Sequence, residues 1–163
     1  MDVVETLIGI TEIAVALAGF TGVVVAFGSR SHGTWHPGDL LRLTFLLEAS
    51  LTAAGFSLLA LLLVSADMHA SDRWLVCSLS WAAYMLGSLI ASRRALSRSE
   101  ATHGDTDKLS NRFTATLFVL MIGTQILNAV FWQDFTPFLA ALVLNLAGAA
   151  MQFTRLIRTT FHG

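Results

Sequence analysis

The chain has 163 residues, of which 55% are hydrophobic and only 13% are charged. A soluble domain of this length needs a charged surface that so few ionic residues cannot supply, so the composition indicates a protein whose solvent is the lipid bilayer. The formal net charge of -1 provides no basic face, which argues against a nucleic acid partner. The single cysteine, Cys77, excludes a disulfide framework and a thiolate metal cluster.

Five apolar stretches approach the length of about 20 residues that a helix needs to cross a bilayer. In chain order they are Val3–Phe27, Leu40–Ala66, Trp74–Ala91, Phe113–Trp132 and Phe138–Phe153. Both prolines fall between these stretches, where a helix has to end. The sequence therefore predicts an all-α integral membrane protein, a single transmembrane domain over residues 1–163 with a bundle of five transmembrane helices. An alternative has four spans and a first helix that lies at the membrane interface.

Basic residues are divided unequally between the two sides of the predicted bundle. With five spans, one side holds nine of the ten Lys and Arg residues and the other holds only Arg73. The nine are Arg30, Arg42, Arg93, Arg94, Arg98, Lys108, Arg112, Arg155 and Arg158. Because Lys and Arg near helix ends accumulate on the cytoplasmic side, we expect the N-terminus outside and the C-terminus inside, in the inner (plasma) membrane of the cell.

One face of the first stretch combines acidic and small residues at helical spacing. Steps of three and four residues define this face, which we call the acidic stripe: Glu5, Gly9, Glu12, Ala16, Gly19, Gly22 and Ala26. The opposite face is expected to carry bulky residues, which are Leu7, Ile13, Leu17, Phe20, Val24 and Phe27. Carboxylates inside a membrane-length segment are costly, so Glu5 and Glu12 are expected to face a water-filled space or a partner.

The acidic stripe predicts a small homo-oligomeric channel in the lipid bilayer that conducts inorganic cations or protons, with the first helix lining the pathway. Around a symmetry axis, Glu5 and Glu12 would form two acidic rings, which attract cations and repel anions. The small residues Gly19, Gly22 and Ala26 would then line a narrow conduit beyond the rings.

A further intramembrane acid, Glu48, lies on a polar face of the second stretch with Thr44, Thr52 and Gly55. The rise of an α-helix places it about 12 Å from the inner boundary of the membrane. It is therefore expected to be too far from Glu12 in depth for a direct pair, although the two acids could line one cavity.

Three alternatives remain open from the sequence. Small residues at four-residue spacing, such as Ala18 and Gly22, let membrane helices pack closely, so the stripe could serve packing alone. Glu12 could instead alternate between a proton and a cationic substrate in a proton-coupled exporter of small molecules. The chain could also be a non-transporting scaffold whose basic third loop docks a cytoplasmic partner.

No catalytic or cofactor-binding motif is found, so the sequence indicates a protein that is not an enzyme and uses no cofactor. His32 and His36 are four residues apart, but Gly33 and Pro37 argue against the helix that a metal site there would need, and no metal is expected. Neutral polar residues in the last two stretches are expected to form hydrogen bonds between those helices: Thr124, Gln125, Asn128, Asn145 and Gln152.

Overall fold

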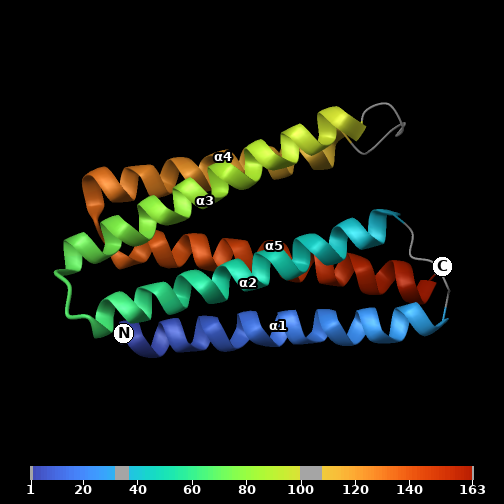
Figure 1. Ribbon diagram of the computed structural model, residues 1–163, viewed down its shortest axis with the longest axis horizontal. Helices are drawn as coiled ribbons and strands as arrows, with labels where there is room; N and C mark the ends of the chain where they lie inside the picture. The colour runs from blue at the N-terminus through green and yellow to red at the C-terminus, as the bar shows by residue number, and fades with distance from the viewer. Residues whose placement is uncertain (1, 32–36, 100–107, 163) are drawn as a thin grey trace. The chain divides into compact units, whose positions relative to one another are not determined.

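The computed structural model describes the backbone of residues 2–31, 37–99 and 108–162. Over these residues the chain is almost entirely helical and contains no strand. The elements are α1 (Val3–Ser31), α2 (Pro37–Ser65), α3 (Ala70–Ser99), α4 (Lys108–Leu127), a π-helical turn (Asn128–Trp132) and α5 (Phe135–His162) (Figure 1). The predicted all-α class is confirmed.

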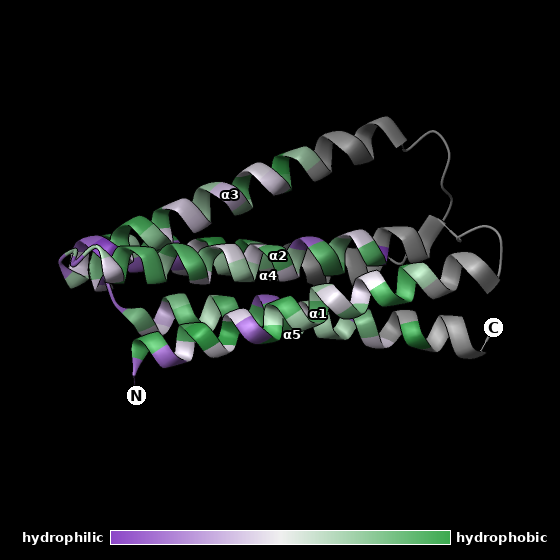
Figure 2. Cartoon of the chain, turned by 60° about the horizontal axis from the view of Figure 1, so that its bottom comes forward, coloured by the Kyte–Doolittle hydropathy of each residue, from purple (hydrophilic) through white to green (hydrophobic). Residues whose placement is uncertain are grey.

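Within the described residues, four helical segments are long and apolar enough to cross a membrane. They are Val3–Ala26, Arg42–Ser65, Ala70–Ala91 and Phe135–Thr154. The fourth predicted span coincides with a shorter apolar stretch, Phe118–Trp132, so the count of five spans and the orientation stay predictions. Figure 2 shows hydrophobic residues, in green, along most of the helical length, and hydrophilic residues, in purple, where α2 leads into α3.

Capping side chains and prolines set the helix ends. The carboxylate of Asp2 accepts a hydrogen bond from the Val4 amide at 2.9 Å, which caps the start of α1. Pro37 opens α2 at a position where its missing N–H would have had no helical partner. Asp134 caps α5 by accepting from the Thr136 amide at 2.8 Å.

Contacts between residues divide the chain into two compact units. The first unit comprises Met1–Asp67 and Leu139–Gly163, and the second comprises Met68–Phe138. The first unit therefore contains α1, α2 and most of α5; α1 and α5 run in the same direction and α2 runs the opposite way (Figure 1). The second unit contains the antiparallel pair α3 and α4, the π-helical turn and the first turn of α5.

In the first unit, α1 packs against α2, and the buried residues of α1 recur three and four positions apart. Leu7, Ile10, Ala14 and Thr21 are buried, and Leu17 packs against the core of the unit. We call these residues the packing seam. A repeat of 3.5 residues keeps such a seam on one side of a helix, as in a left-handed coiled coil. Thr21 fits into the seam because its hydroxyl donates to the Leu17 carbonyl at 2.8 Å.

The core of the first unit joins α2 to α5. Leu46, Ala49 and Ala149 form the buried centre, and Phe153 packs against it. The Asn145 amide Nδ2 donates to the Ala49 carbonyl oxygen at 2.7 Å, so a buried polar side chain of α5 is satisfied by the backbone of α2.

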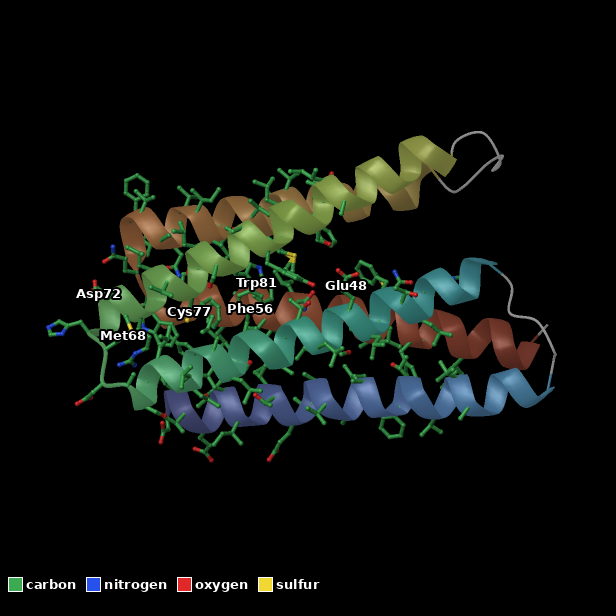
Figure 3. All side chains as sticks on the ribbon, in the orientation of Figure 1. Glu48, Phe56, Met68, Asp72, Cys77 and Trp81 are labelled. Atoms are coloured by element: carbon green, nitrogen blue, oxygen red, sulfur yellow. The ribbon has the colours of Figure 1, made fainter. Side chains whose placement is uncertain are left out.

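In the second unit, aromatic side chains hold α3 against the start of α5. Trp81 and Phe138 are fully buried and pack edge to face, with ring centroids 6.2 Å apart. The Trp74 ring lies 5.1 Å from Phe135 and 5.9 Å from Phe138. Cys77, one turn before Trp81 on α3 (Figure 3), is also fully buried, where a free thiol packs as a small apolar side chain.

A buried amide organises the junction of α4 and α5. Asn128 has no exposed surface. Its Nδ2 donates to Ser78 Oγ at 2.7 Å and to the Asp134 carbonyl at 2.9 Å, and its Oδ1 accepts from the Asp134 amide at 3.1 Å. Gln133, in the left-handed conformation with φ of 50°, ends the π-helical turn.

Candidate functional site on helix α1

The acidic stripe lies on the side of α1 that is turned away from the packing seam. At 3.6 residues per turn, the mean direction of the stripe is about 180° from that of the seam. Every stripe residue is exposed except Gly9, which is half-buried; the exposed ones are Glu5, Glu12, Ala16, Gly19, Gly22 and Ala26. The stripe is therefore a continuous surface feature of the first unit.

The bulky face expected opposite the stripe is divided in the structure. Leu7 is buried and Leu17 is half-buried in the seam, as expected for a face that packs on a neighbour. Ile13 and Phe20, however, are 54% and 59% exposed. The Phe20 ring touches only the edge of the unit, at 6.3 Å from the Phe153 ring. The seam thus lies beside the centre of the bulky face, so side-chain size alone does not decide which residues of α1 are covered.

The glycines of the stripe are not used for close helix contact within the chain. A Cβ atom added to Gly9, Gly19 or Gly22 would meet no atom within 4 Å. Small residues that seat one helix on another have a neighbouring backbone close by. Within the described part of the first unit, packing of α1 on its neighbouring helices therefore does not explain the stripe.

Glu12 also borders a groove between α1 and α2 in the first unit. The groove has a volume of about 570 Å³ and is lined by Ile8, Thr11, Glu12, Val15, Ala16, Leu58 and Leu61. Five of these side chains are aliphatic, and the two polar ones, Thr11 and Glu12, are adjacent on α1. The Thr11 hydroxyl donates to the Leu7 carbonyl at 2.8 Å, which leaves its oxygen able to accept a further hydrogen bond. We call this feature the α1–α2 groove.

Glu48 is exposed on α2 (Figure 3), but at a different level from Glu12. Glu12 shares the groove with Leu58 and Leu61, and Glu48 precedes Leu58 by ten residues. That separation amounts to about 15 Å along the helix axis, so Glu12 and Glu48 are not direct partners. Of the residues expected to share a polar face with Glu48, Thr44 and Gly55 are exposed, whereas Thr52 is 8% exposed and belongs to the interior.

The neutral polar residues near the end of α4 and in α5 were expected to form hydrogen bonds between these two helices. Most of their hydrogen bonds go elsewhere. Asn145 bonds to α2 and Asn128 to α3, as described above. Gln125 Nε2 of α4 donates to the Pro137 carbonyl of α5 at 2.8 Å, and this bond joins the two helices as expected. Thr124 donates to the Leu120 carbonyl of its own helix at 2.8 Å. The hydrogen bonds of these side chains therefore stabilise the fold.

Among the described residues, no group of three or more His, Cys, Asp or Glu side chains is placed to hold a metal ion. His32 and His36 lie outside the described residues. Five groove residues were not singled out from the sequence: Ile8, Thr11, Val15, Leu58 and Leu61. No local pattern could have found them, because the groove depends on how α1 and α2 align across a separation of about 45 residues in the chain.

Comparison of the chain with protein-family models, with curated proteins and with solved structures finds no match. Four long apolar helices define the class, a membrane protein by its composition. Its function is inferred from the residues of this chain alone.

Proposed function

We propose that the protein is a small homo-oligomeric channel that conducts inorganic cations or protons, with α1 lining the pathway. One observation carries the proposal: the acidic stripe is exposed along α1, opposite the buried packing seam, and added Cβ atoms at its glycines would meet no neighbouring atom within 4 Å. The side of α1 that holds two carboxylates is therefore available to a second copy or to water.

The cost of an exposed membrane carboxylate supports this proposal over a stripe that faces lipid. Glu12 lies nine residues into the apolar segment Val3–Ala26, about 14 Å from its start. The free-energy cost of placing a charged side chain near the centre of a bilayer is on the order of 2.5–3.5 kcal/mol on the scale derived from helix insertion, which gives the lowest values. Copies arranged around an axis would avoid that cost by enclosing the carboxylates in a hydrated space.

In such an assembly, Glu5 and Glu12 form the two acidic rings and Gly19, Gly22 and Ala26 line the narrower part. Glu48, about 15 Å from the level of Glu12 along α2, is a separate acidic position and not a third member of the rings. Rings of carboxylates attract cations and repel anions, which is the basis of selectivity in many cation channels.

Ion flux from liposomes tests the proposal through Glu12→Gln. This variant keeps the size and hydrogen bonding of the side chain and removes its charge. We expect the reconstituted wild-type protein to pass cations passively and the variant to fold and assemble normally while losing conductance or cation selectivity. Glu5→Gln, nearer the hydrated boundary, should have a weaker effect in the same direction. Unchanged flux and unchanged pH dependence in Glu12→Gln would rule out the conduction pathway along the stripe.

The α1–α2 groove favours a second candidate, a proton-coupled exporter of small molecules in which Glu12 binds either a proton or a cationic substrate. The groove is large enough for an organic molecule, and Glu12 is its only carboxylate. The same liposomes separate the candidates, because an exporter needs a pH gradient and a channel does not. A scaffold protein would show neither passive nor gradient-driven flux.

A further inference from the structure

We propose that the α1–α2 groove of one copy of the chain receives the Ile13 side chain of the next copy around the axis of the assembly. This inference rests on the proposed function, because it takes the acidic stripe as the face that α1 turns towards that axis. It adds which surfaces of two neighbouring copies meet beside the stripe.

The groove and Ile13 lie on opposite sides of Glu12. Thr11 and Ile13 directly precede and follow Glu12, so they point about 100° to either side of it. Thr11 lines the groove and Ile13 does not. When Glu12 faces the axis of a ring, one of these sides turns towards one neighbour and the other side towards the second neighbour. The contact between copies is then heterologous, with the groove side of each copy against the Ile13 side of the next.

Symmetry also matches the two surfaces in depth. Copies that share one orientation in a membrane are related by rotation about an axis along the membrane normal, which keeps every residue at its own depth. The groove spans Ile8 to Ala16 on α1, and Ile13 lies within that span. Phe20, also exposed on the side of Ile13, lies about 12 Å beyond Glu12 and so outside the level of the groove. Ile13 is therefore the exposed bulky side chain at the matching depth.

The groove and the Ile13 side of α1 are complementary in chemistry and shape. The groove surface is almost wholly apolar, and its walls Ile8, Val15 and Leu58 are 45%, 57% and 54% exposed. Ile13 is itself 54% exposed, so its insertion would cover apolar surface on both copies. Gly9, one turn before Ile13, has no side chain, and a Cβ added there meets no atom within 4 Å. A neighbouring helix can therefore approach closely enough for the packing contacts that hold membrane helices together.

A neighbouring copy fits this position better than a lipid chain does. Glu12 borders the groove, and in the proposed channel its carboxylate is hydrated. An open groove at that level would lead lipid tails to the ring of carboxylates, whereas a side chain of the next copy closes the gap between water and lipid. The cost of a carboxylate against lipid, which favours the assembly, thus also favours a filled groove.

Disulfide cross-linking in nanodiscs tests the contact. In a Cys77→Ala background, Ile13→Cys is combined with Leu58→Cys and the protein is oxidised with copper phenanthroline. A disulfide needs the two Cα atoms within about 7 Å. Within one copy the two positions lie on opposite sides of α1, so a bridge must join two copies, and we expect covalent dimers and larger products on non-reducing gels. Each single cysteine, and the matched pair Phe20→Cys with Leu58→Cys, should remain largely unlinked.

An exchange of side-chain size gives a second measurement. Leu58→Trp should fill the groove and shift the native mass in nanodiscs towards single chains, while circular dichroism shows an intact fold because Leu58 is exposed. Adding Ile13→Ala should restore the oligomer, and adding Phe20→Ala should not. Absence of a bridge between positions 13 and 58, or equal bridging by the Phe20→Cys pair, overturns the proposal, as does equal rescue by the two alanine variants.

Flux and mass measurements on the same preparation separate this proposal from the proposed channel. A conducting oligomer without a bridge between positions 13 and 58 would uphold the channel and reject this contact. The bridge without ion flux would uphold the contact and reject the channel. A wild-type particle of one copy would reject both.

Discussion

Buried amides and exposed carboxylates have different parts in this molecule. Asn128 and Asn145 are buried and donate to acceptors in a neighbouring helix or turn. Glu5 and Glu12 are exposed on the side of α1 opposite its packing seam. A buried amide is retained when its hydrogen bonds are satisfied, whereas an exposed intramembrane carboxylate needs water, a partner or a ligand. The amides therefore stabilise the fold, and the carboxylates remain available for function.

Replacing Asn128 by Ala should destabilise the second unit. The change removes the bonds to Ser78 and to the Asp134 backbone and leaves the Asp134 N–H and carbonyl without that partner. We expect the free energy of unfolding to fall by about 1–3 kcal/mol, seen as a lower unfolding midpoint by circular dichroism in detergent. Ser78→Ala, which removes only one of the bonds, should cost less. Equal losses in the two variants would show that the network does not centre on Asn128.

At the scale of the helices, the sequence predicted most features that depend on residues close together in the chain. Apolar length located the helices. The prediction that both prolines lie between helices was wrong, because Pro37 begins α2 and Pro137 lies in the first turn of α5, where a helix tolerates a missing N–H. The acidic stripe was found from periodicity alone, because residues three and four apart share a face whatever surrounds the helix.

What the sequence could not predict depends on the alignment of one helix with another. Ile13 and Phe20 look as suited to packing as Leu7, yet they are exposed whereas Leu7 is fully buried. Thr52 looks like part of a polar surface and is buried. Leu58 became a groove residue only through its position opposite Glu12. Hydrophobicity gives no information on such long-range register.

Substitutions at Gly22 separate the folding of α1 from its assembly with other copies. A methyl group at this position meets no atom within 4 Å, so Gly22→Ala should leave the fold intact or stabilise the helix slightly, by about 0.5–1 kcal/mol. If the stripe faces other copies, Gly22→Phe should separate the oligomer while circular dichroism remains unchanged. Ala14→Phe, in the fully buried part of the seam, should instead disrupt the fold itself.

Native mass measurement in nanodiscs gives the readout for these variants. The wild-type protein should have the mass of several copies, Gly22→Ala should match it, and Gly22→Phe should shift towards single chains. A wild-type particle of one copy would leave the proposed channel without a pathway, since the two acidic rings require several α1 helices.

At the scale of the whole chain, the direction of the helices bears on topology. In the first unit α1 and α5 run the same way, with α2 antiparallel to both. If these three helices cross the membrane, the start of α1 and the end of α5 lie on opposite sides. The predicted orientation, with the N-terminus outside, then follows from the unequal distribution of Lys and Arg.

Cysteine labelling tests that orientation. With the buried thiol removed by Cys77→Ala, a cysteine introduced by His69→Cys, in the exposed connection between α2 and α3, should react with an impermeant maleimide from outside. One introduced by His103→Cys should react only after the membrane is permeabilised. The reverse pattern, or equal labelling of both sites from outside, would overturn the predicted orientation.

The opposed seam and stripe of α1 have a consequence for how this helix can change over evolutionary time. Glu5 and Ala26 are 21 residues apart, a rise of about 32 Å, so the stripe extends over about the full thickness of the hydrocarbon core of a bilayer, and the seam from Leu7 to Thr21 covers about 21 Å of it. A substitution alters one face and leaves the other intact. Insertion or deletion of one residue near the middle would rotate everything beyond it by about 100° and disrupt both faces together, although the composition would hardly differ. Helix α1 should therefore tolerate changes of residue far better than changes of length.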